Sequence, residues 1–322
     1  MGWKLTRRAA LAAVATPFIA RAEDWPSRPV RLIVGFVAGG GTDITARILA
    51  PKLSEQLGQP VVVDNRPGGA GNLANELAAR AAPDGYTLML GTISQLAVTN
   101  ALIAGLPVNP LTDFATISLA VEVTNLLVVP ADRPWRSVAE LVAAAKARPG
   151  QLTYGSSSIG SAGHLSAALL DQAAGIETVH VPYRGGGQLI TDIITGKVDF
   201  SFATAATTVQ HVQTGRLRAI AVPTARRSAL VPEVPTVAET GVPGYDVSNW
   251  YGLVGPRALP AAVVARLHQA MAVALADAEV LQKMALQGLE PRPSTPEQFA
   301  DYMKAETERW TRVVRAAGIS GG

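Results

Sequence analysis

Three consecutive glycines, Gly39, Gly40 and Gly41, separate an apolar segment from a helical pattern that begins with Thr42 and Asp43. Backbone N–H groups in such a turn are not covered by side chains, and they lie at the positive end of the helix dipole. The turn therefore predicts an anion site. Asp43 could cap the helix or hold Thr42 and a water in place, and we favour capping because acidic residues suit the first turn of a helix.

The same turn does not match the nucleotide-binding motifs. In the segment Gly35-x-x-x-x-Gly40-Gly41-Thr42, glycine replaces the P-loop lysine, so nucleotide phosphates would lose their main positive partner. A dinucleotide-binding fingerprint would need a third glycine where the chain has Ile44. We therefore expect no nucleotide cofactor.

Four more small polar loops follow predicted strands. Ligands of open parallel sheets bind outside the carboxyl ends of the strands. These loops supply hydroxyls and N–H groups rather than charges, which suits a ligand held by hydrogen bonds and helix dipoles. Any one loop could be only a tight turn or a helix cap, but five loops from two halves of the chain favour a shared cleft. The five loops span residues 39–43, 92–95, 156–163, 185–188 and 203–207, and the second loop contains Thr92 and Ser94.

Two catalytic alternatives can be weighed against a binding function. Ser157 lies in the segment Gly155-Ser-Ser-Ser-Ile159, which resembles a nucleophile elbow except for its final isoleucine. A periplasmic serine hydrolase that uses Ser157 with His164 stays open, because catalytic triads are defined by geometry. The spacing of His164, His180, His211 and His268 is not typical of metal ligands. We expect no metal and no other cofactor.

The composition indicates a large globular protein. The 322 residues are 48% hydrophobic and 16% charged, enough to build two lobes. The absence of cysteine excludes disulfides, thiolate metal sites and cysteine nucleophiles. Beyond the N-terminal segment, no stretch reaches the ~18 apolar residues of a membrane span.

Residues 1–22 have the features of a signal peptide. Lys4, Arg7 and Arg8 precede an apolar stretch, and Ala20-Arg21-Ala22 has the small-x-small form of a cleavage site. We expect export to the periplasm with cleavage after Ala22, by the general secretory or the twin-arginine route. A buried N-terminal helix is the alternative. Cleavage would remove four of the 28 basic residues and no acidic residue, leaving 24 basic against 25 acidic residues. No later basic cluster indicates nucleic-acid binding.

Apolar runs alternate with helical patterns in two series, which predicts an α/β protein with mainly parallel sheets. The first series predicts strands at 30–37, 61–63 and 86–90, with helices at 42–57, 71–82 and 95–104. The second predicts strands at 126–130, 152–154, 178–181, 198–202 and 217–221, with helices at 138–147, 164–173, 187–195 and 206–214.

Three helical patterns at 260–276, 279–287 and 295–315, with no strand among them, are expected to pack on the first sheet. We expect segments 125–129 and 250–254 to cross between the lobes as two hinge strands. Lobe 1 would then comprise residues 23–126 and 253–322, and lobe 2 residues 127–252. Two crossings between α/β lobes permit hinge closure, as in periplasmic binding proteins.

Motifs along residues 25–318 resemble the Bug-type periplasmic receptors of tripartite tricarboxylate transporters. Matching stretches include "WPSRPVRLIVGFVAGGGTDITAR", "HVPYRGGGQLITDIITGKVDFSF" and "VPTVAETGVPGYDVSNWYGLVGP". The resemblance implies a two-lobed Venus-flytrap fold of type II with two hinge strands and no enzymatic activity. It also implies a small carboxylate ligand, delivery to membrane permease subunits and a monomeric receptor. A co-receptor that presents the same closed form to a membrane histidine kinase remains an alternative.

The resemblance implies roles for individual residues. Receptors of this family hold a ligand carboxylate with backbone N–H groups and bridging waters, without an obligatory arginine. The matching residues here are Gly39, Gly40, Gly41, Thr42 and Asp43 in the first-lobe loop, Ser156, Ser157, Ser158 and His164 in the second-lobe loop, and Tyr183, Arg184, Gly185 and Gly186 in the segment that closes over the ligand. We expect Ser94 and Thr204 to face the variable end of the ligand. Val37 stands where the family often has proline, and Arg184 where lysine is usual, which leaves the substrate open. Arg184 is expected either to attract an anion at the rim or to be a solvated surface charge.

Overall fold

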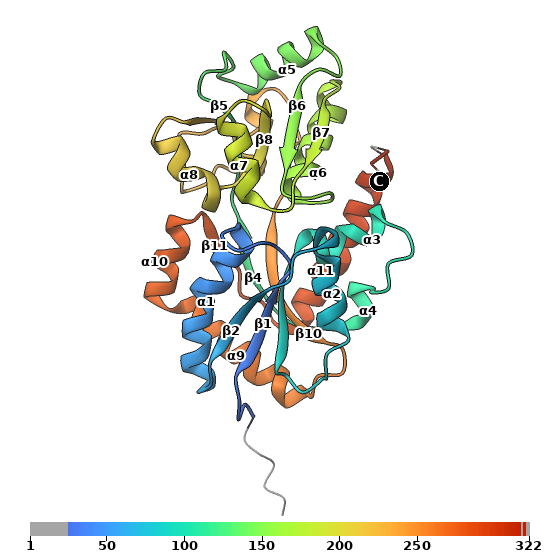
Figure 1. The fold of residues 1–322 in the computed structure, drawn as a ribbon, viewed down its shortest axis with the longest axis vertical. Helices are drawn as coiled ribbons and strands as arrows, with labels where there is room; N and C mark the ends of the chain where they lie inside the picture. The colour runs from blue at the N-terminus through green and yellow to red at the C-terminus, as the bar shows by residue number, and fades with distance from the viewer. Residues whose placement is uncertain (1–24, 317, 320–322) are drawn as a thin grey trace, which may run out of the picture.

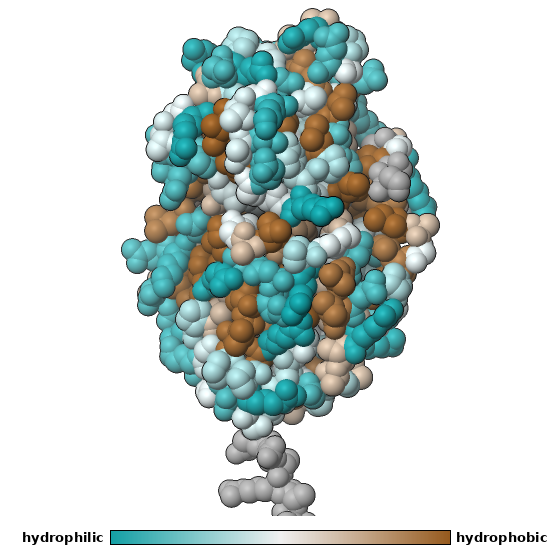
Figure 2. Space-filling model, in the orientation of Figure 1, coloured by the Kyte–Doolittle hydropathy of each residue, from teal (hydrophilic) through white to brown (hydrophobic). Residues whose placement is uncertain are grey.

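A computed structural model describes residues 25–316, 318 and 319, and it consists of two α/β lobes stacked along the long axis of the molecule (Figure 1). The predicted signal peptide, residues 1–22, lies outside the described residues. Residues of intermediate hydropathy gather on the face drawn in Figure 2 where the two lobes meet. Of the large hydrophobic side chains that are exposed among the described residues, seven lie in lobe 1, among them Val62 and Leu286, and one, Val179, lies in lobe 2.

Lobe 1 is built on a six-stranded sheet with the order β11-β4-β10-β3-β1-β2. β1 pairs in parallel with β2 and β3, whereas β10 is antiparallel to β3 and β4, and β11 is antiparallel to β4. The strands are β1 (Val30–Val34), β2 (Val61–Asn65), β3 (Thr87–Thr92), β4 (Phe114–Val123), β10 (Trp250–Pro256) and β11 (Leu289–Pro291). The central strands β3 and β10 are mainly apolar and buried because helices cover both faces of the sheet.

The lobe 1 helices pack on the two faces of this sheet. Leu49 of α1 and Leu267 of α9 share one apolar cluster, and Phe299 and Trp310 of α11 belong to another. The helices are α1 (Gly41–Leu57), α2 (Asn72–Ala79), α3 (Thr99–Leu102), α4 (Pro110–Asp113), α9 (Ala261–Ala276), α10 (Ala278–Leu286) and α11 (Pro296–Ala316), with a 3₁₀ turn η1 (Gly69–Gly71) and a π-helical turn η2 (Ser94–Val98). Over the described part of the chain, no single helix has the length and apolar character to cross a membrane, although α9 and α10 meet that test as a pair bent by 69°.

Lobe 2 is built on a five-stranded sheet with the order β7-β6-β8-β5-β9. β6 is parallel to β7 and β8, and β5 is antiparallel to β8 and β9. The strands are β5 (Asn125–Pro130), β6 (Thr153–Ser156), β7 (Val179–Pro182), β8 (Phe200–Thr204) and β9 (Leu217–Ala221). The helices are α5 (Val138–Ala147), α6 (Ala162–Ala174), α7 (Gly186–Ile194) and α8 (Ala205–Gln213), with a 3₁₀ turn η3 (Ala238–Thr240).

The chain passes between the two sheets at Thr124 and again just before Trp250. The expected crossing strands therefore each belong to one lobe: β5 lies in the lobe 2 sheet and β10 in the lobe 1 sheet. β5 begins two residues before the predicted start of lobe 2, and β10 begins two residues before its predicted end.

Three details of the sequence-based fold are wrong. The sheets are mixed rather than mainly parallel, because β4, β5 and β10 introduce antiparallel pairs. β4 is missing from the prediction, since it leads into β5 through Thr124 alone and no turn signal separates the two strands. β11 lies between α10 and α11, where no strand is predicted, and it is a three-residue strand held by pairing with β4.

Candidate functional site

A cavity with an empty volume of about 620 Å³, its open mouth included, lies between the lobes. Lobe 1 contributes Phe36, the start of α1 and the loop after β3, and lobe 2 contributes the ends of β6 and β8 with the helices that follow them. None of the residues that line the cavity carries a charged side chain.

Four helices begin at the wall of this cavity. α1 starts at Gly41 and α6 at Ala162, while α7 starts at Gly186 and α8 directly follows Thr204. The first N–H groups of a helix have no acceptor within that helix, and the helix dipole places positive potential there. Gly40, which precedes α1, supplies no side chain to cap these groups, and neither α7 nor α8 has a side-chain cap. The cavity therefore presents uncharged donors from both lobes to an anion.

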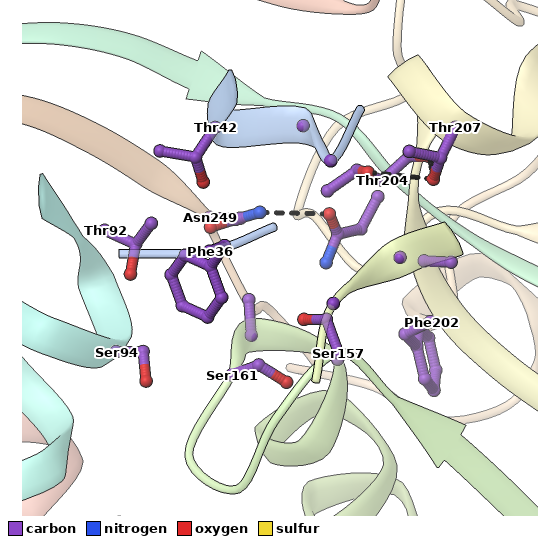
Figure 3. Close-up of a pocket in the computed structure, with 18 of the residues that line it drawn as sticks. Phe36, Thr42, Thr92, Ser94, Ser157, Ser161, Phe202, Thr204, Thr207 and Asn249 are labelled. Carbon is purple, nitrogen blue, oxygen red and sulfur yellow. Dashed lines mark hydrogen bonds between the residues drawn. The ribbon is translucent and has the colours of Figure 1, made fainter. Parts of the chain in front are cut away.

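Hydroxyl side chains from the two lobes face each other across the cavity. Figure 3 shows Thr42, Thr92 and Ser94 of lobe 1 on one side, and Ser157 and Thr204 of lobe 2 on the other. The hydroxyl of Ser94 is buried without a hydrogen-bond partner. Thr204 Oγ1 lies 3.1 Å from Thr207 Oγ1. These hydroxyls can orient a ligand after the helix termini have attracted it.

Two glycines that line the cavity lie at contacts between the lobes. A Cβ at Gly41 of lobe 1 would lie 3.1 Å from Thr204 Oγ1 of lobe 2. A Cβ at Gly185 of lobe 2 would lie only 2.5 Å from Val37 Cγ2 of lobe 1, and the backbone of Gly185 has a φ of 140°. The structure thus describes a closed form, in which side chains at these two positions would push the lobes apart.

A hydrogen bond between two buried asparagines connects the two segments in which the chain passes between the lobes. Asn249 Nδ2 donates a hydrogen bond of 3.1 Å to Asn125 Oδ1, and both residues line the cavity (Figure 3). Tyr251, on the strand that follows Asn249, also lines the cavity, and burial raises the pKa of its phenol to about 12. The phenol is therefore neutral and able to donate a hydrogen bond.

Nine of the sixteen predicted site residues line the cavity, and these are Gly40, Gly41, Thr42, Thr92, Ser94, Ser157, Gly185, Gly186 and Thr204. Sequence reasoning did not select Phe36, Asn125, Ser161, Phe202, Thr207, Asn249 and Tyr251 as ligand-contacting residues, although they line it too. The sequence does contain a signal for Asn125 and Asn249. Each is a single amide side chain directly before the apolar residues of a strand, at a point where the chain passes between the lobes. The other seven predicted residues, Gly39, Asp43, Ser156, Ser158, His164, Tyr183 and Arg184, lie outside this cavity.

Asp43 stabilises the glycine turn from outside the cavity. Its carboxylate accepts a hydrogen bond of 2.9 Å from the N–H of Gly39 and forms an ion pair with Arg47 at 2.9 Å. Burial by itself would raise the pKa of Asp43, but hydrogen bonds from Arg47, Gly39 and Asn65 lower it below its ordinary value. The N–H of Gly39 precedes the N-cap residue Gly40, and α1 has no side-chain cap, so Asp43 holds the glycine turn and does not have the capping role favoured from the sequence.

Ser156 and His164 support the serine-rich loop from within lobe 2. Ser156 Oγ lies 2.7 Å from His180 Nε2, and His164 Nδ1 accepts a hydrogen bond of 3.0 Å from the N–H of Gly160. The rings of His164 and His180 stack with centroids 4.0 Å apart. Burial lowers the pKa of His164 to about 4, and burial together with His164 lowers that of His180 to about 3. Both imidazoles are therefore neutral at ordinary pH.

The hydrolase alternative lacks its predicted geometry. Among the hydrogen bonds of residues 25–316, the serine hydroxyl bonded to a histidine ring is that of Ser156 with His180, both away from the cavity, and not that of Ser157 with His164. Within the same described range, no group of three or more histidines and carboxylates is arranged to hold a metal ion.

The remaining predicted residues lie beside the cavity. Ser158, Tyr183 and Arg184 line a neighbouring chamber between the lobes, which shares Phe36 and Ser157 with the cavity. Tyr183 donates a hydrogen bond of 3.0 Å to Asp192 within its own lobe.

Comparison with known proteins identifies the family. Residues 45–319 match the model of TctC, the tripartite tricarboxylate transporter family receptor. The chain is 37% identical to the UPF0065 protein in the tcbD-tcbE intergenic region of a Pseudomonas species, over 91% of this chain and 88% of that protein. It is 35% identical to protein BugT of Bordetella pertussis, over 96% of this chain and 94% of BugT.

Solved structures resemble the whole described fold. Rpa4515 of R. palustris, solved with adipate, is similar with a TM-score of 0.89 and 37% identity, over 92% of this chain and 99% of that one. MatC from Rhodopseudomonas palustris, solved with bound malate, has a TM-score of 0.85 and 32% identity, over 90% of this chain and 99% of that one. The chain therefore belongs to the TctC family of tripartite tricarboxylate transporter receptors, a family of solute-binding receptors and not of enzymes.

Proposed function

We propose that this receptor binds a small organic carboxylate in the cavity between its lobes and delivers it to the membrane subunits of a tripartite tricarboxylate transporter. The observation that carries the proposal is the convergence of four helix N-termini, from both lobes, on a cavity with no charged side chain. A carboxylate matches this arrangement because its two oxygens can accept several N–H and O–H donors at once.

The similar structures support this ligand class. One of them holds adipate and another holds malate. Both ligands are small carboxylates, and both proteins share the two-lobed fold over nearly their whole length. Water molecules that bridge a carboxylate to the glycine turn would add affinity at little entropic cost.

Closure links binding to delivery. A ligand favours the closed form only if it binds that form more tightly than the open form, so it has to contact both lobes. Donors from Gly41 and Thr42 in lobe 1, and from Gly186 and Thr204 in lobe 2, meet this condition. The closed surface is what a permease would recognise. Receptors of this family are periplasmic, and we propose that the signal peptide at residues 1–22 exports this one, which acts as a monomer.

A thermal-shift screen of the mature protein tests the ligand class. Mono-, di- and tricarboxylates, aromatic acids and amino acids would be compared with neutral amides of the same shape, such as adipamide. At 100 times its Kd a ligand stabilises the native state by about 2.7 kcal/mol, which corresponds to a rise in Tm of several degrees. We expect a rise with at least one acid and none with its amide. Equal shifts with both, or no shift with any acid, would contradict the proposal.

An uptake assay tests delivery. In cells that lack the receptor but retain the permease subunits, radiolabelled uptake of the acid found in the screen should return when the receptor is supplied. The variant Gly41→Val serves as the matched negative control, because its added side chain would lie in the cavity. Restored uptake by Gly41→Val would contradict this route.

A further inference from the structure

The C-terminal helix α11 lies alongside the second passage of the chain between the lobes, residues 246–250. Phe299 of α11 packs edge-on against the indole at the start of β10, with ring centroids 5.8 Å apart, so this part of the helix belongs to lobe 1. The other end of the helix reaches lobe 2, because Ala316 and Ile319 line a surface pocket together with Ala168 of α6. α11 can therefore contact the chain on both sides of the passage.

The lobe 1 end of the passage is attached to a buried carboxylate of α11. Glu306 is only 5% exposed, and its Oε2 accepts hydrogen bonds of 3.0 Å from the indole N–H groups of both Trp250 and Trp310. Trp250 is the first residue of β10, and its side chain is completely buried. Removing a carboxylate from water costs free energy, which several hydrogen-bond donors together can offset. Glu306 therefore fixes the start of β10 to α11.

The other end of the passage is attached to lobe 2. The hydroxyl of Tyr245 donates a hydrogen bond of 2.6 Å to the peptide oxygen of Ser166 in α6. The N–H of Val247 donates one of 2.8 Å to the peptide oxygen of Pro223, which follows β9. Asp246 lies between these two attached residues, so its peptide group has to move with lobe 2.

Arg309 of α11 connects the two ends of the passage. Its Nη2 donates a hydrogen bond of 2.7 Å to the peptide oxygen of Asp246, and its Nη1 lies 3.5 Å from Oε1 of Glu306. The guanidinium carbon lies 5.1 Å from the ring centre of Trp310, which is a favourable cation–π position. Arg309 is therefore held by two residues of its own helix while it binds a peptide group of lobe 2.

We propose that Arg309 is a positioning residue for lobe closure, whose hydrogen bond to the peptide oxygen of Asp246 stabilises the closed orientation of lobe 2. The bond spans the passage, so rotation of lobe 2 away from the closed orientation has to stretch or break it. Arg309 lines neither the cavity nor the neighbouring chamber, so it acts on ligand affinity through the population of the closed form and not through contact. This link to affinity rests on the proposed function, whereas the effect on closure requires no ligand.

Disulfide trapping measures the closed form without a ligand. The chain contains no cysteine, and a Cβ at Gly185 of lobe 2 would lie 3.8 Å from the Cβ of Val37 of lobe 1. That separation is typical of disulfides, so Val37→Cys together with Gly185→Cys gives a pair that can bond only when the lobes are closed. In a glutathione redox buffer, the equilibrium constant for this disulfide is proportional to the fraction of closed molecules.

Three substitutions are compared in this cysteine-pair background. Arg309→Met keeps an apolar side chain and removes the donors, and it should lower the equilibrium constant about threefold or more. Arg309→Lys retains a cationic donor for the peptide oxygen of Asp246, so it should recover part of the loss. Arg312→Met is the matched control, because Arg312 is an exposed arginine of the same helix and forms none of the ion pairs found among the described residues. It should leave the constant unchanged.

The outcomes separate closure from packing. An unchanged constant in Arg309→Met, an equal loss in Arg312→Met, or no disulfide in the background without further substitutions would overturn the role of Arg309. A constant in Arg309→Lys no higher than in Arg309→Met would also overturn it, because the hydrogen bond would then contribute nothing. The measurement uses no ligand. Failure of the proposed function would therefore appear separately, as the absence of carboxylate binding in the thermal-shift screen.

Discussion

Asn249 donates a hydrogen bond of 3.1 Å to Asn125, and each of these residues lies at one of the two points where the chain passes between the lobes. Both side chains are buried, and both line the ligand cavity. The peptide oxygen of Asn249 also accepts a hydrogen bond of 2.8 Å from the N–H of Val123, the last residue of β4. The hinge and the ligand site therefore share the same two side chains, so that ligand contacts and lobe orientation are coupled.

A double-mutant cycle on this pair measures the coupling. Replacing either Asn125 or Asn249 with alanine leaves its partner buried without a hydrogen bond, which should lower the free energy of unfolding by about 1–3 kcal/mol. The double variant should lose less than the sum of the single variants, because the shared interaction is already absent. Denaturant unfolding of the four proteins gives the coupling energy, and strictly additive losses would contradict an energetic link.

Gly41→Val should weaken ligand binding at least tenfold while the protein remains folded. The added side chain would begin 3.1 Å from Thr204 Oγ1 and from the hydroxyl of Tyr251, and would cover the donors at the start of α1. Gly187→Val is the matched control, since a Cβ at Gly187 meets nothing within 4 Å. Calorimetric titration and Tm of both variants provide the test. Comparable affinity in the two variants would show that Gly41 does not contact the ligand.

Gly185→Ala should hold the lobes apart. Its methyl group would lie 2.5 Å from Val37 Cγ2, and the φ of 140° at this position is unfavourable for alanine. We expect a larger radius of gyration in the presence of ligand, measured by small-angle scattering, and a weaker affinity. A second substitution, Val37→Ala, removes the clash and should restore part of the affinity. If the double variant binds no better than Gly185→Ala, contact between these residues is not what limits closure.

The stacked pair of His164, which is buried, and His180, which is partly buried, predicts a loss of stability in mild acid. The folded-state pKa values of about 4 for His164 and about 3 for His180 lie below the ordinary value of about 6.5. As the pH falls below 6.5, the unfolded chain binds protons that the folded chain does not, so stability falls across the window down to these values. Each unit of pKa difference corresponds to about 1.4 kcal/mol.

The partly buried Asp171 has the opposite effect on the pH dependence of stability. Burial raises the pKa of Asp171 to about 6, so between its ordinary value of about 4 and pH 6 the folded chain keeps a proton that the unfolded chain releases. Its contribution stabilises the folded state as the pH falls, but two histidines outweigh one acid. Tm should therefore drop between pH 7 and pH 4, and His180→Gln should reduce that drop. His268→Gln in lobe 1 is the control, and an equal effect of both substitutions would contradict the assignment.

The elements that position the site could be predicted where local signals are strong. The glycine turn before α1 and the small polar residues before α6, α7 and α8 mark the N-termini of helices in the sequence itself, because those positions require bare or capping residues. For that reason the sequence alone predicts that the start of α1, Ser157, Gly185 and Thr204 lie near one another, and all four line the cavity.

The parts that could not be predicted depend on tertiary structure. Sequence patterns do not show which face of the serine-rich loop meets the ligand, and Ser156 and His164 point into lobe 2 because His180 and Tyr154 stack there. No glycine or proline separates β4 from β5, and the boundary at Thr124 is set by the change of sheet. Phe36 lines the cavity from a bend after β1, a position that periodicity does not mark.

A crystal structure of the protein with its bound acid tests the central claim most directly. The account predicts a carboxylate between the lobes, with its oxygens within hydrogen-bond distance of donors at Gly41 or Thr42 of lobe 1 and at Gly186 or Thr204 of lobe 2, directly or through one water. A carboxylate that contacts only one lobe, or that is held by a charged side chain at a different place in the molecule, would contradict it.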